Sequence, residues 1–247
     1  MKDNTILRVL VGSRAHGLST PSSDYDWRGI FVTPTEEILK LGTRKQQTNW
    51  IEGKEDDTSW EIGHFLNLAT HCNPTILEVF AAPGWNMSFV GGDRVPYPKE
   101  VTRRYYFGLK LQGLFPYVWN SKGVMDAFVG YGLNQRKKFL DDKDVRPAKY
   151  AVAYLRTLYQ ADALFKSGTL VVDMRQSPIY ETLVRWKQGH WDYGEVIQLT
   201  REWEKKVRTT YDLYPKHTAD LDKVNEFLLK VRREFWDGSK DKEVAEC

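Results

Sequence analysis

The sequence predicts an α+β fold in which strands come first and helices follow. Short apolar runs bounded by Gly, Ser and Pro occupy the first 32 residues, and such runs are typical of β-strands. Residues 82–98 are rich in Pro and Gly, which marks a boundary between two parts of the chain. Beyond this boundary the apolar residues recur at helical spacing. We therefore expect two parts, residues 1–98 and residues 99–247.

Two strands are predicted at the start of the chain. The first covers residues 6–11, an apolar run that is broken only by Arg8, and the second covers residues 29–32. A short helix is expected after the second strand, because Thr33 is suited to cap a helix and Pro34 suits its first turn.

Two more helices are predicted before the boundary. An amphipathic helix is expected over residues 60–71, where apolar residues recur on one face: Ile62, Phe65, Leu66 and Ala69. Asn73 and Pro74 end this helix, and Pro74 suits the first turn of the next one.

The second part is predicted to be all-helical. The helical spacing is clearest over residues 148–166, and Gly168 is suited to end that helix. Other helices are predicted over four segments: residues 124–141, 179–188, 193–207 and 219–236. The charged tail that begins at Asp237 is expected to be disordered.

The composition is that of a soluble globular protein. Of the 247 residues, 41% are hydrophobic and 28% are charged, and the net charge is only +3. This charge excludes a histone-like polycation, so binding to nucleic acid would need a local basic patch. The chain has two cysteines, Cys72 and Cys247, too few for a disulfide framework or a Cys-rich metal site. The N-terminal apolar run is too short for a signal peptide or membrane span, so we expect a cytoplasmic protein with no membrane partner.

Two aspartates one residue apart, Asp24 and Asp26, lead into the second predicted strand. Side chains alternate faces along a strand and rise about 3.3 Å per residue, so these two would share one face, about 6.6 Å apart. Paired carboxylates without a counter-charge repel each other, and a hard cation such as Mg²⁺ removes that repulsion. The pair is therefore a candidate metal site.

Gly12 and Ser13 stand at the end of the first predicted strand. Gly12 has no side chain, so the backbone can turn sharply there and a ligand can approach it closely. Ser13 would lie where free N–H groups and a hydroxyl can hold a phosphate. A phosphate site beside a pair of metal-binding acids suits a nucleoside triphosphate (NTP).

Two short motifs together resemble the nucleotidyltransferase signature of the DNA polymerase beta superfamily: Gly12-Ser13 and Asp24-Tyr25-Asp26. Two longer runs are similar to one bacterial and phage branch of predicted nucleotidyltransferases, some of them tied to RNA repair: GSRAHG at residues 12–17 and SDYDWRGIF at residues 23–31. Residues 73–78, NPTILE, also look like this branch. The similarity covers most of the chain and is strongest in the first eighty residues.

The resemblance implies a nucleotidyltransferase core over residues 1–98, with a small mixed β-sheet and flanking helices, and an all-helical lobe over residues 99–247. It implies transfer of a nucleoside monophosphate from an NTP to an acceptor hydroxyl, with release of pyrophosphate. Two Mg²⁺ or Mn²⁺ ions are the expected cofactors. Gly12 and Ser13 would seat the β- and γ-phosphates. Arg14 and Arg28 are candidates for further charge-assisted bonds, although either is also suited to pair with a nearby acid.

A third carboxylate is expected on a strand beside Asp24 and Asp26. By the match to the family we choose Asp56 as the third catalytic and metal-binding residue. Asp57 stays open as the alternative, because it points to the opposite face and the register is not fixed by the sequence. Glu61 is the remaining candidate, and an ordinary acidic turn is the plainer interpretation of this segment.

Lys149 and Arg156 lie seven residues apart on the predicted helix over residues 148–166, close to two turns, so they can face one direction. In related nucleotidyltransferases a helical lobe packs against the catalytic sheet, and the resemblance implies that this pair holds the triphosphate. Two solvated cations are the alternative.

The acceptor stays open between an RNA 3′ end, a protein hydroxyl and a small molecule. Two basic clusters favour nucleic acid: Arg103-Arg104 and Arg136-Lys137-Lys138. The rival from another class is a non-catalytic nucleotide-binding or antitoxin-like partner protein with the same fold. The preferred base, the oligomeric state and the pathway are not indicated by the sequence.

Overall fold

The structure is a computed structural model. It describes seven stretches of the chain: residues 4–42, 47–49, 57–82, 89–90, 93–94, 103–141 and 146–236. Asp56, most of the predicted boundary at 82–98 and the predicted disordered tail lie outside the described residues.

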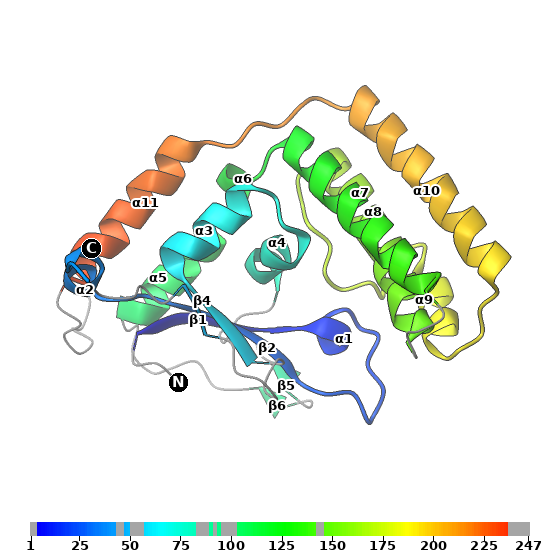
Figure 1. Ribbon diagram of the computed structural model, residues 1–247, viewed down its shortest axis with the longest axis horizontal. Helices are drawn as coiled ribbons and strands as arrows, with labels where there is room; N and C mark the ends of the chain where they lie inside the picture. The colour runs from blue at the N-terminus through cyan, green and yellow to red at the C-terminus, as the bar shows by residue number, and fades with distance from the viewer. Residues whose placement is uncertain are drawn as a thin grey trace.

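The first part of the chain forms a small mixed β-sheet with the strand order β1-β2-β4-β3, and Figure 1 labels β1, β2 and β4 of this sheet. Strand β1 (Thr5–Val11) runs antiparallel to β2 (Asp26–Phe31), and β2 runs parallel to β4 (Asp57–Glu61). The short strand β3 (Thr48–Asn49) is antiparallel to β4 and lies at the edge. The α+β fold class predicted from the sequence is confirmed. Strands β5 (Phe89–Val90) and β6 (Asp93–Arg94) form a separate pair.

The register brings the end of β1 and the beginnings of β2 and β4 together at one end of the strands, which we call the active-site edge of the sheet. Val11, the last residue of β1, pairs with Asp26, the first residue of β2. Trp27 pairs with Asp57, the first residue of β4. The motif residues that follow β1 therefore lie beside the beginnings of β2 and β4.

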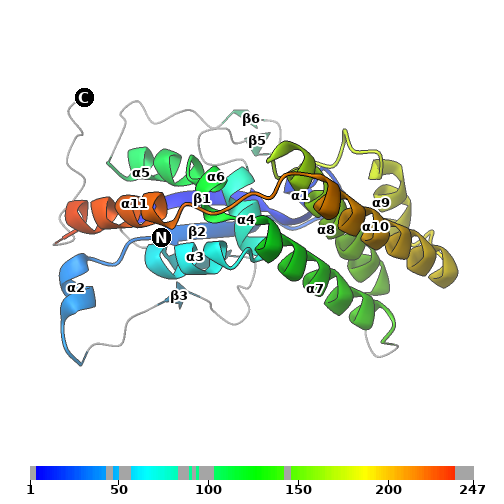
Figure 2. The ribbon, with the colours of Figure 1, turned by 90° about the horizontal axis from the view of Figure 1, so that it is seen from above.

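Helices from both halves of the sequence cover the sheet (Figures 1 and 2). Helix α5 packs against β1, and α11 packs against α3 and α6 although it is the last helix in the chain. The helices around the sheet are α2 (Thr35–Leu39), α3 (Ile62–Thr70), α4 (Pro74–Ala81), α5 (Arg103–Gln112), α6 (Phe115–Val118) and α11 (Leu221–Glu234). The division at residue 98 stays a prediction, but helices from beyond it complete the core around the sheet.

A second group of helices surrounds α8 (Pro147–Ser167), which packs against α7 (Ser121–Phe139), α9 (Tyr180–Lys187) and α10 (Tyr193–Leu213). Helix α8 is central because its apolar residues recur at helical spacing on one face, and six of these apolar residues are completely buried: Ala151, Tyr154, Leu155, Leu158, Ala161 and Leu164. It ends at Gly168, whose φ of 69° is left-handed, as the sequence predicted.

Most predicted helices are confirmed, but the predicted cap at Thr33 is wrong. Pro34 stands at the N-cap of α2 and provides no side-chain cap. The first amides of α2 instead donate to the end of α11: Thr35 N–H to the Phe235 carbonyl at 2.9 Å and Glu36 N–H to the Trp236 carbonyl at 3.0 Å. Pro74 stands in the first turn of α4 as expected, and Asn73, for which no cap was predicted, caps this helix by accepting from Ile76 N–H at 3.3 Å. No helix in the described stretches has the length and apolarity that crossing a membrane requires.

Candidate active site

The Gly12 backbone lies directly against the Asp26 carboxylate. Gly12 begins the short helix α1 (Gly12–Ala15), and its φ of +68° turns the chain away from β1. A Cβ at Gly12 would lie 1.9 Å from Asp26 Oδ2, a distance no real side chain tolerates. Glycine is therefore required twice over, for the turn and for the approach of the carboxylate.

Asp24 and Asp26 do not sit on one regular strand as expected. Strand β2 begins only at Asp26, and Asp24 lies in the irregular segment between the turn at residues 21–22 and that strand. The turn persists because Ser23 Oγ accepts from Thr20 N–H at 2.8 Å, and because β1 leaves the ladder at Gly12. Asp24 is exposed and Asp26 is half-buried, so solvent reaches the active-site edge of the sheet.

Arg14 holds the segment that carries Asp24. Its Nε donates to the carbonyls of Ser23 and Asp24, both at 3.1 Å, and its Nη2 donates to Ser23 at 2.5 Å. The guanidinium also lies over the Tyr25 ring, 3.8 Å from the centroid. These contacts connect α1 to the acidic segment. The expected contact of Arg14 with a nucleotide stays a prediction.

Asp57 lies on the opposite face of the sheet from Asp26. It pairs in register with Trp27, the neighbour of Asp26, and side chains of successive strand residues point to opposite faces. Its carboxylate accepts from Arg8 Nη2 at 3.1 Å. The third candidate, Glu61, caps α3 by accepting from Gly63 N–H at 2.7 Å. Asp56 lies outside the described residues, so its predicted role stays a prediction.

The residues at the active-site edge of the sheet fit a divalent cation. Asp24 and Asp26 supply hard carboxylate oxygens, and the Asp26 carboxylate is seated where the missing Cβ of Gly12 leaves room. Among the described residues, no three His, Cys, Asp or Glu side chains gather as a metal site. A complete set of three carboxylates would therefore need a residue outside those stretches, which is where Asp56 lies.

Three consecutive carbonyls after α1 accept hydrogen bonds from the helical part of the chain. Met174 N–H donates to the His16 carbonyl at 3.1 Å, and the Tyr180 hydroxyl donates to the Gly17 carbonyl at 3.2 Å. Lys187 Nζ donates to the Leu18 carbonyl at 2.6 Å. Tyr180 and Lys187 are the first and last residues of α9, and Met174 precedes this helix. We call this set the carbonyl clamp. It fixes α9 against the motif that begins at Gly12.

Sequence reasoning missed Lys187, the last residue of α9. The residue is half-buried, and burial lowers the pKa of its ammonium group, while the nearby Asp26 charge acts to raise it. Nothing in its local sequence sets it apart from other lysines at helix ends. Only the tertiary arrangement brings it to Asp26.

A buried polar cluster joins the motif to α4 and α8. Glu78 forms an ion pair with Arg156, accepts from Gln160 Nε2 at 3.0 Å and lies 3.4 Å from His16 Nε2. Burial alone would raise the pKa of Glu78, but the charge of Arg156 and the contact with His16 outweigh burial and hold that pKa well below its usual range. Burial, with the Arg156 charge, lowers the pKa of His16.

Lys149 and Arg156 do not form one exposed cationic pair. Arg156 is only 8% exposed and is bound to Glu78, whereas Lys149 is exposed in the first turn of α8. The structure therefore gives Arg156 an internal partner that the sequence did not indicate, and the expected contact of both residues with a triphosphate stays a prediction. Arg28 Nη1 donates to the Trp27 carbonyl at 2.7 Å.

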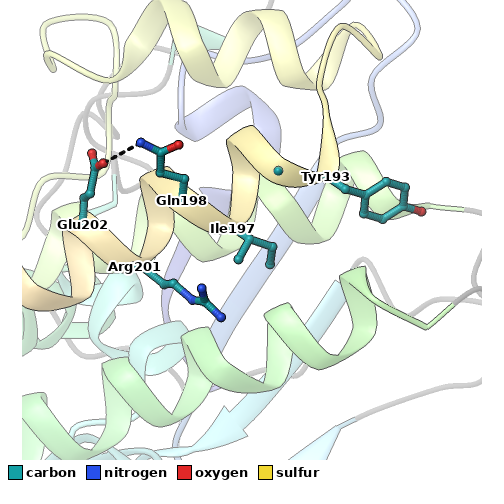
Figure 3. A pocket seen from close by; sticks show the side chains of 6 residues that line it. Tyr193, Ile197, Gln198, Arg201 and Glu202 are labelled. Atoms are coloured by element: carbon teal, nitrogen blue, oxygen red, sulfur yellow. Dashed lines mark hydrogen bonds between the residues drawn. The ribbon is translucent and has the colours of Figure 1, made fainter.

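A surface depression on α10 is separate from this site. Its lining comes from one helix and includes Tyr193, Ile197 and Arg201, with Gln198 donating to Glu202 at 3.1 Å (Figure 3). None of its lining residues belongs to the motif, to β2 or to the carbonyl clamp. We therefore assign it no part in the chemistry.

Comparisons with known proteins show the family to which the sequence is similar. Residues 2–230 match the family described as "RNA repair pathway DNA polymerase beta family", RlaP. The chain is 23% identical to "Uncharacterized protein YcgL" of Bacillus subtilis (strain 168), in an alignment that covers 94% of this chain and 90% of that protein. Over 88 residues it is 32% identical to "Uncharacterized 38.9 kDa protein in nrdC-mobD intergenic region" of Enterobacteria phage T4, covering 32% of this chain and 26% of the phage protein. This match thus spans about a quarter of the phage protein. No solved structure matches the chain significantly.

Proposed function

Because the chain belongs to the RNA repair pathway DNA polymerase beta family, we propose that it transfers a nucleoside monophosphate from an NTP to an acceptor hydroxyl and releases pyrophosphate. The observation that carries the proposal is the Asp26 carboxylate seated against Gly12, at the active-site edge of the sheet, where β1 ends and β2 and β4 begin. A carboxylate beside a glycine turn suits a metal-bound triphosphate.

Each motif residue has a proposed part in this reaction. Asp24 and Asp26 hold divalent ions, which when bound supply charge neutralisation and a lower pKa for the acceptor hydroxyl. Gly12 and Ser13 seat the phosphates, which is supported by the N-cap Val11, since it provides no side-chain cap for the first amides of α1. Arg14 positions Asp24 through the Ser23 and Asp24 carbonyls.

For the third carboxylate we propose Asp56 rather than Asp57. The position of Asp57 supports this choice, because Asp57 faces away from Asp26 and is paired with Arg8. The two candidates are adjacent, so they can be separated with matched variants. We expect Asp56→Asn to reduce turnover by about 100-fold or more, a size typical of losing a group that stabilises the transition state, and Asp57→Asn to change it by less than about threefold.

The proposed acceptor is an RNA 3′ end. The description of the family supports it, and so do the basic residues at the end of α7, where Lys137 and Lys138 are exposed and Arg136 is half-buried. Binding that depends on phosphate contacts weakens steeply as salt rises. RNA affinity that is absent or insensitive to salt would remove this acceptor and favour a small molecule.

The test is incubation of the protein with labelled NTPs, Mg²⁺ or Mn²⁺ and RNA carrying a free 3′ hydroxyl. We expect label on the RNA and release of pyrophosphate, both abolished in the double variant Asp24→Ala, Asp26→Ala. Circular dichroism of the variant checks that the fold is intact. Transfer by this double variant at the wild-type rate would contradict the mechanism. NTP binding without transfer to any acceptor would favour the rival, a non-catalytic nucleotide-binding partner protein.

A further inference from the structure

We propose that Lys187 binds the phosphates of the NTP held at Asp24 and Asp26, and that it is the cation that the helical part of the chain contributes to the site. This inference rests on the proposed function and assigns to Lys187 the part that the sequence predicted for Lys149 and Arg156. Its basis is the place of Lys187 in the carbonyl clamp and the charge of Asp26 beside it.

The carbonyl clamp fixes where the Lys187 ammonium lies. Nζ donates to the Leu18 carbonyl at 2.6 Å, only five residues beyond Ser13. The neighbouring Gly17 and His16 carbonyls accept from Tyr180 and Met174, so α9 cannot shift along this segment without breaking these contacts as well. The ammonium is therefore held in place before any ligand arrives, which reduces the entropy lost on binding.

The Lys187 ammonium keeps capacity for a second acceptor. An ammonium group has three N–H donors, and the Leu18 carbonyl uses one of them. The group is half-buried, so part of its hydration is lost, and no carboxylate in the described stretches is within ion-pair distance to replace it. A phosphate oxygen beside Asp26 would replace that hydration with a charge-assisted hydrogen bond.

Two of the cations that the sequence predicted at the triphosphate, Arg14 and Arg156, already have partners among the described residues. Arg14 donates to the carbonyls of Ser23 and Asp24, and Arg156 is bound to Glu78 and Gln160 inside the buried cluster. Moving Arg156 toward a ligand would leave the buried Glu78 charge uncompensated. Lys187 can gain a phosphate contact without such a loss.

The experiment measures equilibrium binding of two probes, a non-hydrolysable ATP analogue with Mg²⁺ and AMP, to four full-length proteins. These are the wild type, Lys187→Met, Lys187→Arg and the control Arg185→Met, which removes a cation two residues away on the same helix. We expect Lys187→Met to weaken binding of the triphosphate by about tenfold or more and of AMP by less than about twofold, the loss of a charge-assisted hydrogen bond. Lys187→Arg should recover part of the affinity for the triphosphate, and Arg185→Met should match the wild type.

A purely structural role would give a different result. If Lys187 only holds the Leu18 carbonyl, Lys187→Met should lower the melting temperature and weaken both probes equally, and that outcome overturns the inference. Triphosphate binding by Lys187→Met equal to that of Arg185→Met overturns it as well. Asp26→Asn distinguishes failure of this inference from failure of the proposed function. If the wild type and Asp26→Asn bind the triphosphate with equal affinity, the proposed function itself fails, whatever the result for Lys187.

Discussion

At the scale of single residues, Gly12 is required both for the backbone turn after β1 and for the position of the proposed metal ligand Asp26. Its φ of +68° and the approach of Asp26 Oδ2 to 1.9 Å of a Cβ position both exclude a side chain. Gly168 has nearly the same φ, +69°, but a Cβ there would meet nothing within 4 Å among the described atoms. Substitutions at Gly12 and Gly168 therefore distinguish the effect of backbone strain from the effect of displacing the Asp26 carboxylate.

We expect Gly168→Ala to lower the free energy of unfolding by roughly 1–2 kcal/mol, because an L-residue is strained at positive φ, and to leave NTP binding unchanged. Gly12→Ala should lose at least as much stability, because it adds the clash with Asp26 to the same strain, and it should also lose metal-dependent NTP binding, since the Asp26 carboxylate must move. Denaturant unfolding and equilibrium binding measure the two effects. Equal NTP affinity in the two variants would show that the position of Asp26 does not matter.

His16 makes stability depend on pH. Its pKa is lowered from the ordinary value of about 6.5, first by burial and then by the charges of Arg156 and Lys187, although Glu78 opposes them. The unfolded chain therefore binds a proton before the folded one does, and the free energy of unfolding should fall as the pH drops from about 7.5 to about 5.5. Urea unfolding at the two pH values measures this. His16→Gln should show a smaller fall, and an identical fall in both proteins would contradict the assignment.

The sequence identified some of these residues and not others for a physical reason. Gly12, Ser13, Asp24 and Asp26 lie close together along the chain, so local spacing reveals them. The partners Glu78 and Arg156 are 78 residues apart, and Lys187 reaches a carbonyl 169 residues away. Contacts at such separations depend on tertiary packing, which a single sequence does not display.

At the scale of elements, the helix ends that local chemistry determines were predicted correctly. Gly168 ends α8 and Pro74 stands in the first turn of α4, because each acts on its own turn. The cap of α2 was predicted wrongly, because its amides are satisfied by Phe235 and Trp236 at the other end of the chain. The start of β2 was misjudged for a related reason, since pairing with β1 stops at Gly12.

The ion pair between Glu61 and Arg232 joins α11 to the end of β4. Arg232 Nη1 and Nη2 lie 2.6 Å and 2.9 Å from the two Glu61 oxygens, and the side chains are 18% and 9% exposed. Arg232→Met would leave a buried carboxylate without its partner, so we expect a loss of about 3–5 kcal/mol in the free energy of unfolding.

Arg185→Met is the matched control for this prediction. It breaks the exposed ion pair with Glu195, whose side chains are 46% and 33% exposed, and should change stability by at most about 1 kcal/mol. Chemical denaturation of both variants measures the difference. Similar losses in the two would mean that burial does not strengthen the Glu61–Arg232 contact.

At the scale of the whole molecule, one continuous apolar core runs from the sheet through α8 to α11. Two kinds of contact join the sheet to later helices: α11 packs on α3, and the carbonyl clamp holds α9 to the motif. We therefore expect a single calorimetric transition whose van 't Hoff and calorimetric enthalpies agree. Two separate transitions would instead support independent units on either side of residue 98.

The central claim is that Asp24 and Asp26 hold a divalent ion against a triphosphate. The most direct measurement is electron paramagnetic resonance of Mn²⁺ titrated into the protein with a non-hydrolysable ATP analogue. The account predicts that the wild type converts the free Mn²⁺ signal into a bound one, and that the folded double variant Asp24→Asn, Asp26→Asn does not. Bound Mn²⁺ of equal stoichiometry and affinity in that variant would contradict the account.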